Sequence, residues 1–264
     1  MKKFFFVSIA FLLCLPLMAQ TSSEGGQQYT NKLAVGAGIH QAYMSDRNFS
    51  PLRYNESGLM GAFRFESQND QSHFSIRASY SADSLAPPAI EQFTTYYQMG
   101  NFALRYLRKN ESLSNSRFQF YWGGQFDFHL YSIDWDYQES FSFLVNYSLD
   151  LSARGQYQLN DRGRLQLDLD IPLINFLVRP PYNGLDAELI DNNANDDLLA
   201  IITNGSVGSV NKLLAYRLSL AYQYALSDRL DLELIYRNQL HHTFDTNRFI
   251  HLQNQLMAGL AFNF

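Results

Sequence analysis

The chain has 264 residues, of which 15% are aromatic, and its formal net charge at pH 7 is −5. A mildly acidic balance without clusters of basic residues argues against a nucleic-acid partner. The one cysteine in the sequence is Cys14, so a disulfide framework and a thiolate metal site are excluded.

Residues 1–19 have the layout of a secretory signal peptide. Lys2 and Lys3 precede a short apolar run that ends at the small residue Ala19. This run is too short and too early for a transmembrane helix, so we expect export and cleavage after Ala19. Loss of the two lysines lowers the formal charge from −5 to −7. Lipid attachment at Cys14 is an alternative, but the residue before it is larger than that signal requires.

After a short N-terminal segment at residues 20–32, apolar and polar residues alternate along the chain. Leu165, Leu167 and Leu169, for example, alternate with Asp168 and Asp170. A period of two predicts strands with one apolar and one polar face. Such strands cross a hydrocarbon layer in about 9–11 residues when tilted. We predict ten strands, at residues 33–44, 57–67, 73–82, 96–107, 117–131, 141–159, 164–174, 211–226, 230–240 and 248–264.

The predicted connections differ in length at the two ends of the sheet. Short turns are expected at 68–72, 160–163 and 227–229, and a connection of intermediate length at 108–116. Longer loops are expected at 45–56, 83–95, 132–140, 175–210 and 241–247. This asymmetry predicts an all-β fold over residues 33–264, a closed antiparallel up-and-down transmembrane β-barrel with both termini periplasmic. A closed cylinder satisfies every backbone group in lipid and leaves no free edge.

Charged residues of both signs recur on the face that would line the lumen. An eight-stranded barrel is just filled by its side chains, so ten strands leave little extra room. We expect these charges to pair across the lumen, because an unpaired ion in a confined interior is costly. A wide pore is then not expected, and a narrow solute channel is an alternative by analogy of fold. The predicted lumen network comprises Arg64, Glu66, Arg77, Arg105, Asp127, Asp150, Arg154, Asp168, Asp170, Arg217, Asp231, Glu233 and Arg237.

Several histidines lie near the ends of the first and last strands, which become neighbours when the barrel closes. Imidazoles beside a carboxylate suit zinc binding or general-base chemistry. No ligand-spacing rule is met here, so we expect no metal and no cofactor. We expect these histidines to be ordinary polar residues at the water-exposed rim of the barrel. The predicted rim cluster comprises His40, His241, His242, Asp245 and His251.

Asp127 and His129 lie two apart on one face of the fifth predicted strand and form a candidate catalytic pair. A same-face carboxylate pair comes from Asp134 and Asp136, or from Asp168 and Asp170. This set resembles the omptin proteases, ten-strand barrels in which an Asp–His pair and an Asp pair activate water. The order of the pairs along the chain is reversed here, and Asp168 and Asp170 are expected to lie too deep. A surface hydrolase is therefore an alternative function.

The long outward loop 175–210 contains alternate acidic and amide residues at Asp191, Asn193, Asn195 and Asp197. The spacing resembles the start of an EF-hand calcium loop, but the required glycine and the closing glutamate are absent. We expect an acidic, solvated loop, whose apolar segment 198–205 could cover the barrel mouth or contact a partner.

The chain ends on an alternating apolar strand, at Leu256, Ala258, Leu260, Phe262 and Phe264. Together with the signal peptide and the strand plan, this ending resembles Gram-negative outer-membrane β-barrel proteins, whose last strand commonly ends on phenylalanine. The resemblance implies contact with outer-membrane lipid and recognition of these five residues by the barrel-insertion machinery. It leaves the activity open. We expect a non-enzymatic surface or envelope protein that binds through its loops or works in a larger assembly.

Overall fold

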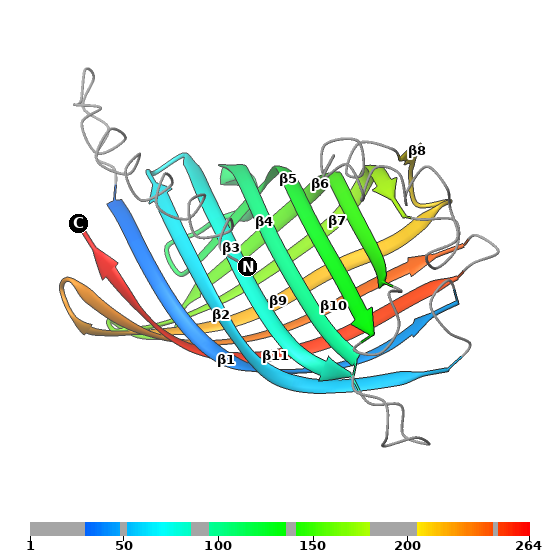
Figure 1. The fold of residues 1–264 in the computed structure, drawn as a ribbon. Helices are drawn as coiled ribbons and strands as arrows, with labels where there is room; N and C mark the ends of the chain where they lie inside the picture. Colours follow the sequence, from blue (N-terminus) through cyan, green and yellow to red (C-terminus); the bar gives the residue numbers. More distant parts are fainter. Residues whose placement is uncertain (1–29, 48–51, 86–94, 136–140, 180–204, 245–247) are drawn as a thin grey trace.

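The computed structural model describes residues 30–47, 52–85, 95–135, 141–179, 205–244 and 248–264. These residues form a single closed antiparallel sheet (Figure 1). Among them, no helix is long and apolar enough to span a membrane. The predicted signal peptide, Asp136, Asp245 and the calcium-like motif at 191–197 lie outside the described residues.

Ten long strands make the barrel, as predicted, and an eleventh short strand is added to it. Each long strand pairs with its neighbours along the chain, and β1 pairs with β11 to close the sheet. A 3-10 helix, η1 (Glu111–Leu113), lies between β4 and β5. The strands are β1 (Thr30–Asp46), β2 (Tyr54–Gln68), β3 (Ser72–Leu85), β4 (Thr95–Lys109), β5 (Phe118–Trp135), β6 (Phe141–Gln158), β7 (Gly163–Val178), β8 (Ser206–Gly208), β9 (Leu213–Ser227), β10 (Leu230–Thr243) and β11 (Phe249–Asn263).

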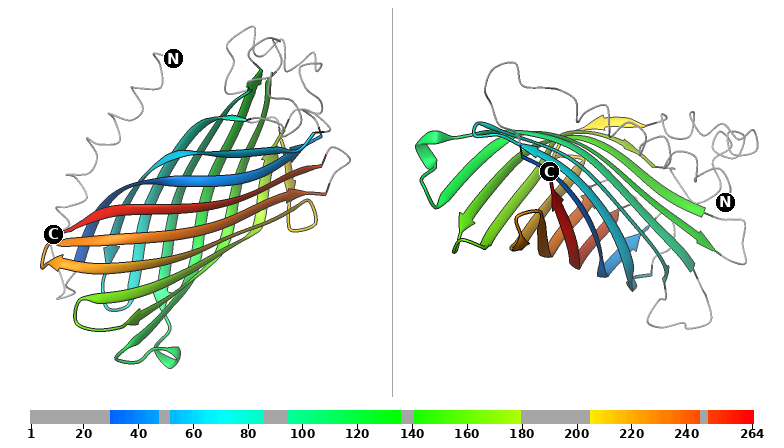
Figure 2. Two further views of the ribbon diagram at one scale, coloured as in Figure 1. Left: turned by 90° about the horizontal axis from the view of Figure 1, so that it is seen from below. Right: turned by 90° about the vertical axis from the view of Figure 1, so that its left-hand side faces the viewer.

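The two ends of the barrel differ in their connections (Figures 1 and 2). The short connections 69–71, 110–117, 159–162 and 228–229 lie at the same end as the start of β1 and Phe264. We name this the turn end and the opposite end the loop end. The strands are tilted against the barrel axis and curve along their length, as closure of a sheet requires (Figure 2).

Several strands run further toward the loop end than the sequence predicts. β10 continues to Thr243, so His241 and His242 belong to a strand and the prediction of a loop at 241–247 is wrong for them. β7 continues to Val178, and β8 pairs with the last residues of β7, with Phe176 opposite Val207. The loop predicted at 175–210 therefore includes sheet at both of its ends, because backbone pairing continues after the simple apolar alternation has stopped.

The terminal phenylalanine is held in the closing seam of the barrel. Phe264 donates its N–H to the carbonyl of Asn31 at 2.9 Å, and Asn31 donates back to the carbonyl of Phe264 at 3.2 Å. Further along the same seam the two backbones approach closely, since a Cβ on Gly259 would lie 2.7 Å from the carbonyl oxygen of Val35. The last strand is therefore fixed along its whole length by pairing with the first.

Candidate functional site in the barrel lumen

Apolar side chains cover the outside of the barrel, and charged side chains fill the inside. Leu59 is 75% exposed and Val35 59% exposed on the outer face, whereas Arg105 and Arg154 are each 1% exposed within the lumen. Of the charged residues predicted to face the lumen, all are buried except Arg64 and Arg237, which are half-buried. The inside of the barrel is thus where ionic and polar chemistry is concentrated.

The turn-end half of the lumen is organised around Arg154. Its guanidinium donates to Asp168 Oδ1 at 2.6 Å and to Glu66 Oε1 at 3.0 Å, and its Nη1 lies 2.6 Å from His73 Nε2. Arg105 lies 3.3 Å from the same Asp168 carboxylate. Five strands, β2, β3, β4, β6 and β7, therefore contribute to one network of charged and polar groups across the lumen.

Further ion pairs continue this network around the barrel. Lys32 pairs with Asp231 at 2.5 Å, and Arg64 donates to both oxygens of Glu233 at 2.6 and 2.5 Å. Asp150 accepts from neutral groups instead, from Gln125 at 3.0 Å and Ser148 at 2.6 Å. Charges of opposite sign thus stand beside one another through much of the lumen, which offsets part of the cost of burying them.

The candidate catalytic pair is held within this network. Asp127 accepts two hydrogen bonds from Arg217, at 2.9 and 3.2 Å, and one from Asn101 at 3.0 Å. His129 is fully buried, and its ring lies 4.6 Å from that of His241. Asp134 stands opposite Tyr96 in the β4–β5 register. Asp127 thus neutralises an arginine, and no described contact links it to His129.

A second group of polar side chains lies nearer the loop end, and we name it the histidine–tyrosine cluster. Tyr131 Oη lies 2.7 Å from His251 Nδ1 and 3.1 Å from His241 Nδ1, and Tyr97 Oη lies 3.1 Å from His251 Nε2. The Glu56 carboxylate stands 3.6 Å from a ring nitrogen of each of two histidines, His40 and His251. The cluster comprises His40, Glu56, Tyr97, His129, Tyr131, His241 and His251.

Three of the five predicted rim residues, His40, His241 and His251, therefore come together. His242 does not join them, because adjacent strand residues point to opposite faces, and it packs on the outer side against Phe244 with ring centroids 4.7 Å apart. Within the described parts of the chain, no group of three histidine, cysteine or acidic residues could hold a metal ion.

An apolar layer adjoins the cluster toward the loop end and shares Tyr97 and Tyr131 with it. Its members come from seven strands, so it extends across the width of the barrel. Asp46, at its edge, accepts from Ser142 at 3.1 Å and pairs with Arg179, whose guanidinium lies 5.6 Å from the ring centroid of Phe249. The layer comprises Met44, Tyr54, Tyr97, Met99, Tyr131, Ile133, Leu144, Leu177 and Phe249.

Several solved structures resemble this chain at very low sequence identity. The outer membrane protease OmpT from Escherichia coli is 8% identical to this chain, over 93% of this chain and 99% of OmpT, with a TM-score of 0.50. The fold is that of an outer-membrane β-barrel. The translocator domain of the autotransporter NalP from Neisseria meningitidis matches at 10% identity, over 98% and 97% of the two chains, with a TM-score of 0.39. Neisserial surface protein A matches at 12% identity, over 88% and 97%, with a TM-score of 0.37.

No protein-family model and no curated protein matches the chain. The closed ten-strand barrel and its likeness to OmpT confirm the predicted resemblance to Gram-negative outer-membrane barrels for the architecture. At such identities the likeness concerns the fold alone.

Sequence reasoning missed part of what lines this barrel. Glu56, Tyr97 and Tyr131 were not among the predicted site residues, although each lies on the inward parity of its strand. A signal was present, since His129 and Tyr131 follow Asp127 at alternate positions and share its face. Their meeting with His251 depends on pairing across the lumen, which a single strand's pattern does not contain.

Proposed function

We propose that this chain is an integral outer-membrane protein of a Gram-negative bacterium whose barrel is a closed, non-enzymatic scaffold that binds an envelope or surface molecule at its loop end. The observation that carries the proposal is that side chains from different walls of the barrel meet across the lumen. Paired charges occupy its turn-end half, and the apolar layer crosses its loop-end half. With the interior occupied in this way, the outer surface and the loop end are the parts left available for contacts.

The outer face supports the membrane part of the proposal. On β11 the outward residues from Leu256 to Phe264 are apolar over nine positions, close to the 9–11 that a tilted strand needs. A polar row follows at once toward the loop end, where Asn238, Asn254, Gln41 and Ser57 stand side by side in register on four adjacent strands. Asn238 donates to Asn254 at 2.9 Å within this row.

We take this row as the outer boundary of the hydrocarbon. Tyr236 donates to Asn254 at 2.7 Å, as an interfacial tyrosine does when its ring lies in the apolar region and its hydroxyl at the polar edge. In this frame the loop-end parts of the strands project beyond the membrane. The outward side chains of Leu256, Phe262 and Phe264 on the last strand are then available to lipid and, during assembly, to the insertion machinery.

The competing functions find less support in the geometry. A hydrolase of the omptin kind needs its Asp–His pair accessible to a peptide, whereas His129 is 0% exposed and Asp127 is engaged by Arg217. A channel needs a continuous passage, whereas the apolar layer lies across the described part of the lumen.

The experiment combines localisation with three activity measurements on the full mature protein. We expect recovery in the detergent-extracted outer-membrane fraction, no peptide cleavage, no conductance steps in a planar bilayer, and cross-linking to an envelope molecule on intact cells. Val207 and Val210 are 66% and 51% exposed at the loop end, so Val207→Asp with Val210→Asp should reduce the cross-link. Leu113→Asp is the matched control, since Leu113 is 56% exposed at the turn end.

Two results would contradict the closed, non-enzymatic scaffold, and a third would contradict the membrane placement. Peptide cleavage that Asp127→Ala abolishes would establish the hydrolase, and conductance whose ion selectivity changes in Arg217→Ala would establish the channel. Recovery of the mature chain as a freely soluble periplasmic protein would contradict its membrane placement.

A further inference from the structure

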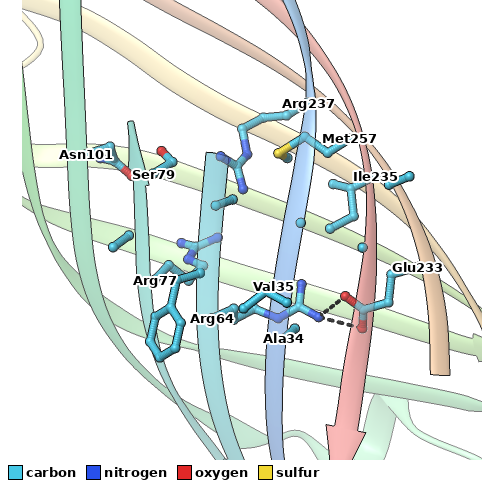
Figure 3. Close-up of a pocket in the computed structure, with 16 residues that line it drawn as sticks. Ala34, Val35, Arg64, Arg77, Ser79, Asn101, Glu233, Ile235, Arg237 and Met257 are labelled. Atoms are coloured by element: carbon cyan, nitrogen blue, oxygen red, sulfur yellow. Dashed lines mark hydrogen bonds and ion pairs between the residues drawn. The ribbon is translucent and has the colours of Figure 1, made fainter. Parts of the chain in front are cut away.

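A small cavity lies in the lumen between the wall formed by β1, β2 and β11 and a group of arginines (Figure 3). Its volume is about 40 Å³. Since one water needs about 10–15 Å³ by this measure, the space holds about three waters or one small ion. Figure 3 shows Arg64, Arg77 and Arg237, from three different strands, directed toward this space.

The three guanidinium groups around the cavity differ in their carboxylate partners. Arg64 is paired with Glu233 through two hydrogen bonds, and Arg77 is paired with Asp170 at 3.0 Å. Arg237 lies within ion-pair distance of no carboxylate in the part of the chain that the structure describes. Its Nε donates to Ser219 Oγ and its Nη1 to Gln255 Oε1, each at 3.2 Å. Arg64 also lies 3.5 Å from Glu66. Of the three guanidinium groups, Arg237 is therefore the one whose positive charge has no carboxylate beside it among the described residues.

The opposite wall offers nothing that could balance this charge. It is built from Ala34, Gly36, Ala62 and Gly259, whose side chains are small or absent. Gly259 has a structural reason to lack a side chain, because a Cβ would lie 2.7 Å from the backbone oxygen of Val35. Ser79 adds a hydroxyl to the lining. The cavity thus combines hydrogen-bond donors, a guanidinium without a carboxylate partner and free volume in one place.

We infer that this cavity is a binding site for one small monovalent inorganic anion, chloride under ordinary conditions, held by Arg237 together with Arg64 and Arg77. An uncompensated guanidinium in a confined interior is costly, and an anion among N–H donors removes that cost through charge-assisted hydrogen bonds. A space of about 40 Å³ suits a halide and excludes nucleotides and sugar phosphates. The inference concerns the inside of the barrel and holds whatever the loop end binds.

The test uses the refolded full mature protein in detergent. The line width of ³⁵Cl NMR reports exchange of chloride with the site, and thermal unfolding in sodium chloride is compared with sodium gluconate at equal ionic strength. We expect chloride-dependent line broadening and a higher Tm in chloride. Arg237→Gln should weaken chloride binding about tenfold, since it removes one charge-assisted partner. Arg237→Lys, which keeps the charge, should retain binding more than Arg237→Gln does.

Arg164→Gln is the matched control, because the Arg164 guanidinium also bonds an amide oxygen, that of Gln223, at 2.7 Å but lies outside the cavity. Crystals soaked in sodium bromide provide a readout that needs no variant. An anomalous peak between the three guanidinium groups supports the site. Water alone at that position, no chloride-dependent broadening, or broadening that persists unchanged in Arg237→Gln overturns it.

Discussion

Replacing Arg154 by methionine tests whether the lumen charges hold the barrel together. The side chain is 1% exposed, and its guanidinium bonds Asp168 at 2.6 and 3.2 Å and Glu66 at 3.0 Å. Methionine keeps much of the length but leaves two buried carboxylates without their main partner. Removing one side of a buried ion pair typically costs about 3–5 kcal/mol. Asp168 keeps Arg105 at 3.3 Å, so we expect a loss of about 3 kcal/mol, the lower end of that range.

The assay is urea unfolding of the refolded protein in detergent micelles, followed by tryptophan fluorescence. Arg162→Met is the control, since Arg162 lies exposed in the turn 159–162 and should change the free energy of unfolding by less than about 0.5 kcal/mol. The double variant Arg154→Met with Asp168→Leu replaces the pair by apolar groups and should recover more than half of the loss. A single variant within about 1 kcal/mol of the wild type would refute the reasoning, because it would mean that water solvates these charges.

Three further predictions concern the cluster, the seam and the terminus. Tyr131→Phe removes the hydrogen bonds to His251 (2.7 Å) and His241 (3.1 Å) and should cost about 1–3 kcal/mol in urea unfolding, with an unchanged value arguing that the cluster is hydrated. Gly259→Val places a Cβ 2.7 Å from a backbone oxygen and should cost about 1–3 kcal/mol, and a stable variant would show that the seam can widen. Deletion of Phe264 removes both hydrogen bonds to Asn31 and should lower the assembled fraction on unheated gels, whereas normal assembly would show that the last residue is dispensable.

The fold could be predicted because one physical rule acts on every strand within the apolar belt. An apolar outer face and an ionic lumen alternate strictly, as in Leu165 to Asp170 of β7, and this repeats around the sheet. Short turns between consecutive strands then predict that these strands are neighbours in the sheet. Both features are local, so a single sequence contains them.

The extent of the strands could not be predicted in the same way, because the face that carries the apolar residues changes near the polar row. On β1 the first inward residues beyond His40 are Ala42 and Met44, which precede Asp46, while Gln41 and Ser45 face outward. Apolar residues thus move from the outer face to the inner face. A rule that expects apolar residues on the outer face therefore fails beyond the polar row. The predicted strands end close to this row.

The candidate site was predicted only in part for a related reason. The charged residues were found because each strand marks its inward face, but their partners lie on strands far apart in sequence, as with Arg154 and Glu66. Pairing across the lumen depends on tilt and on register around the whole cylinder. Glu56 and Tyr97 lie where the alternation has changed phase, so nothing local set them apart from ordinary strand residues.

The outer face becomes polar and the inner face becomes apolar at the same height along the barrel. The two changes have a common physical cause. On our membrane placement the surroundings below the polar row are lipid, so the outer face is apolar and the lumen carries the charges. Above the row the surroundings are water on our membrane placement, and on β1, β2 and β4 the outer face turns polar at Ser45, Asn55 and Gln98. The barrel there needs an apolar core, as any water-exposed sheet does, and the layer around Met44 and Tyr131 supplies it. The histidine–tyrosine cluster lies at the junction, where side chains with an apolar body and a polar tip join an ionic interior to an apolar one. On this reasoning the main role of the cluster is structural, because it connects the ionic and the apolar parts of the interior. Removing the hydroxyls of Tyr97 and Tyr131 should destabilise the loop-end half of the barrel more than the turn-end half. Amide hydrogen exchange would measure this difference.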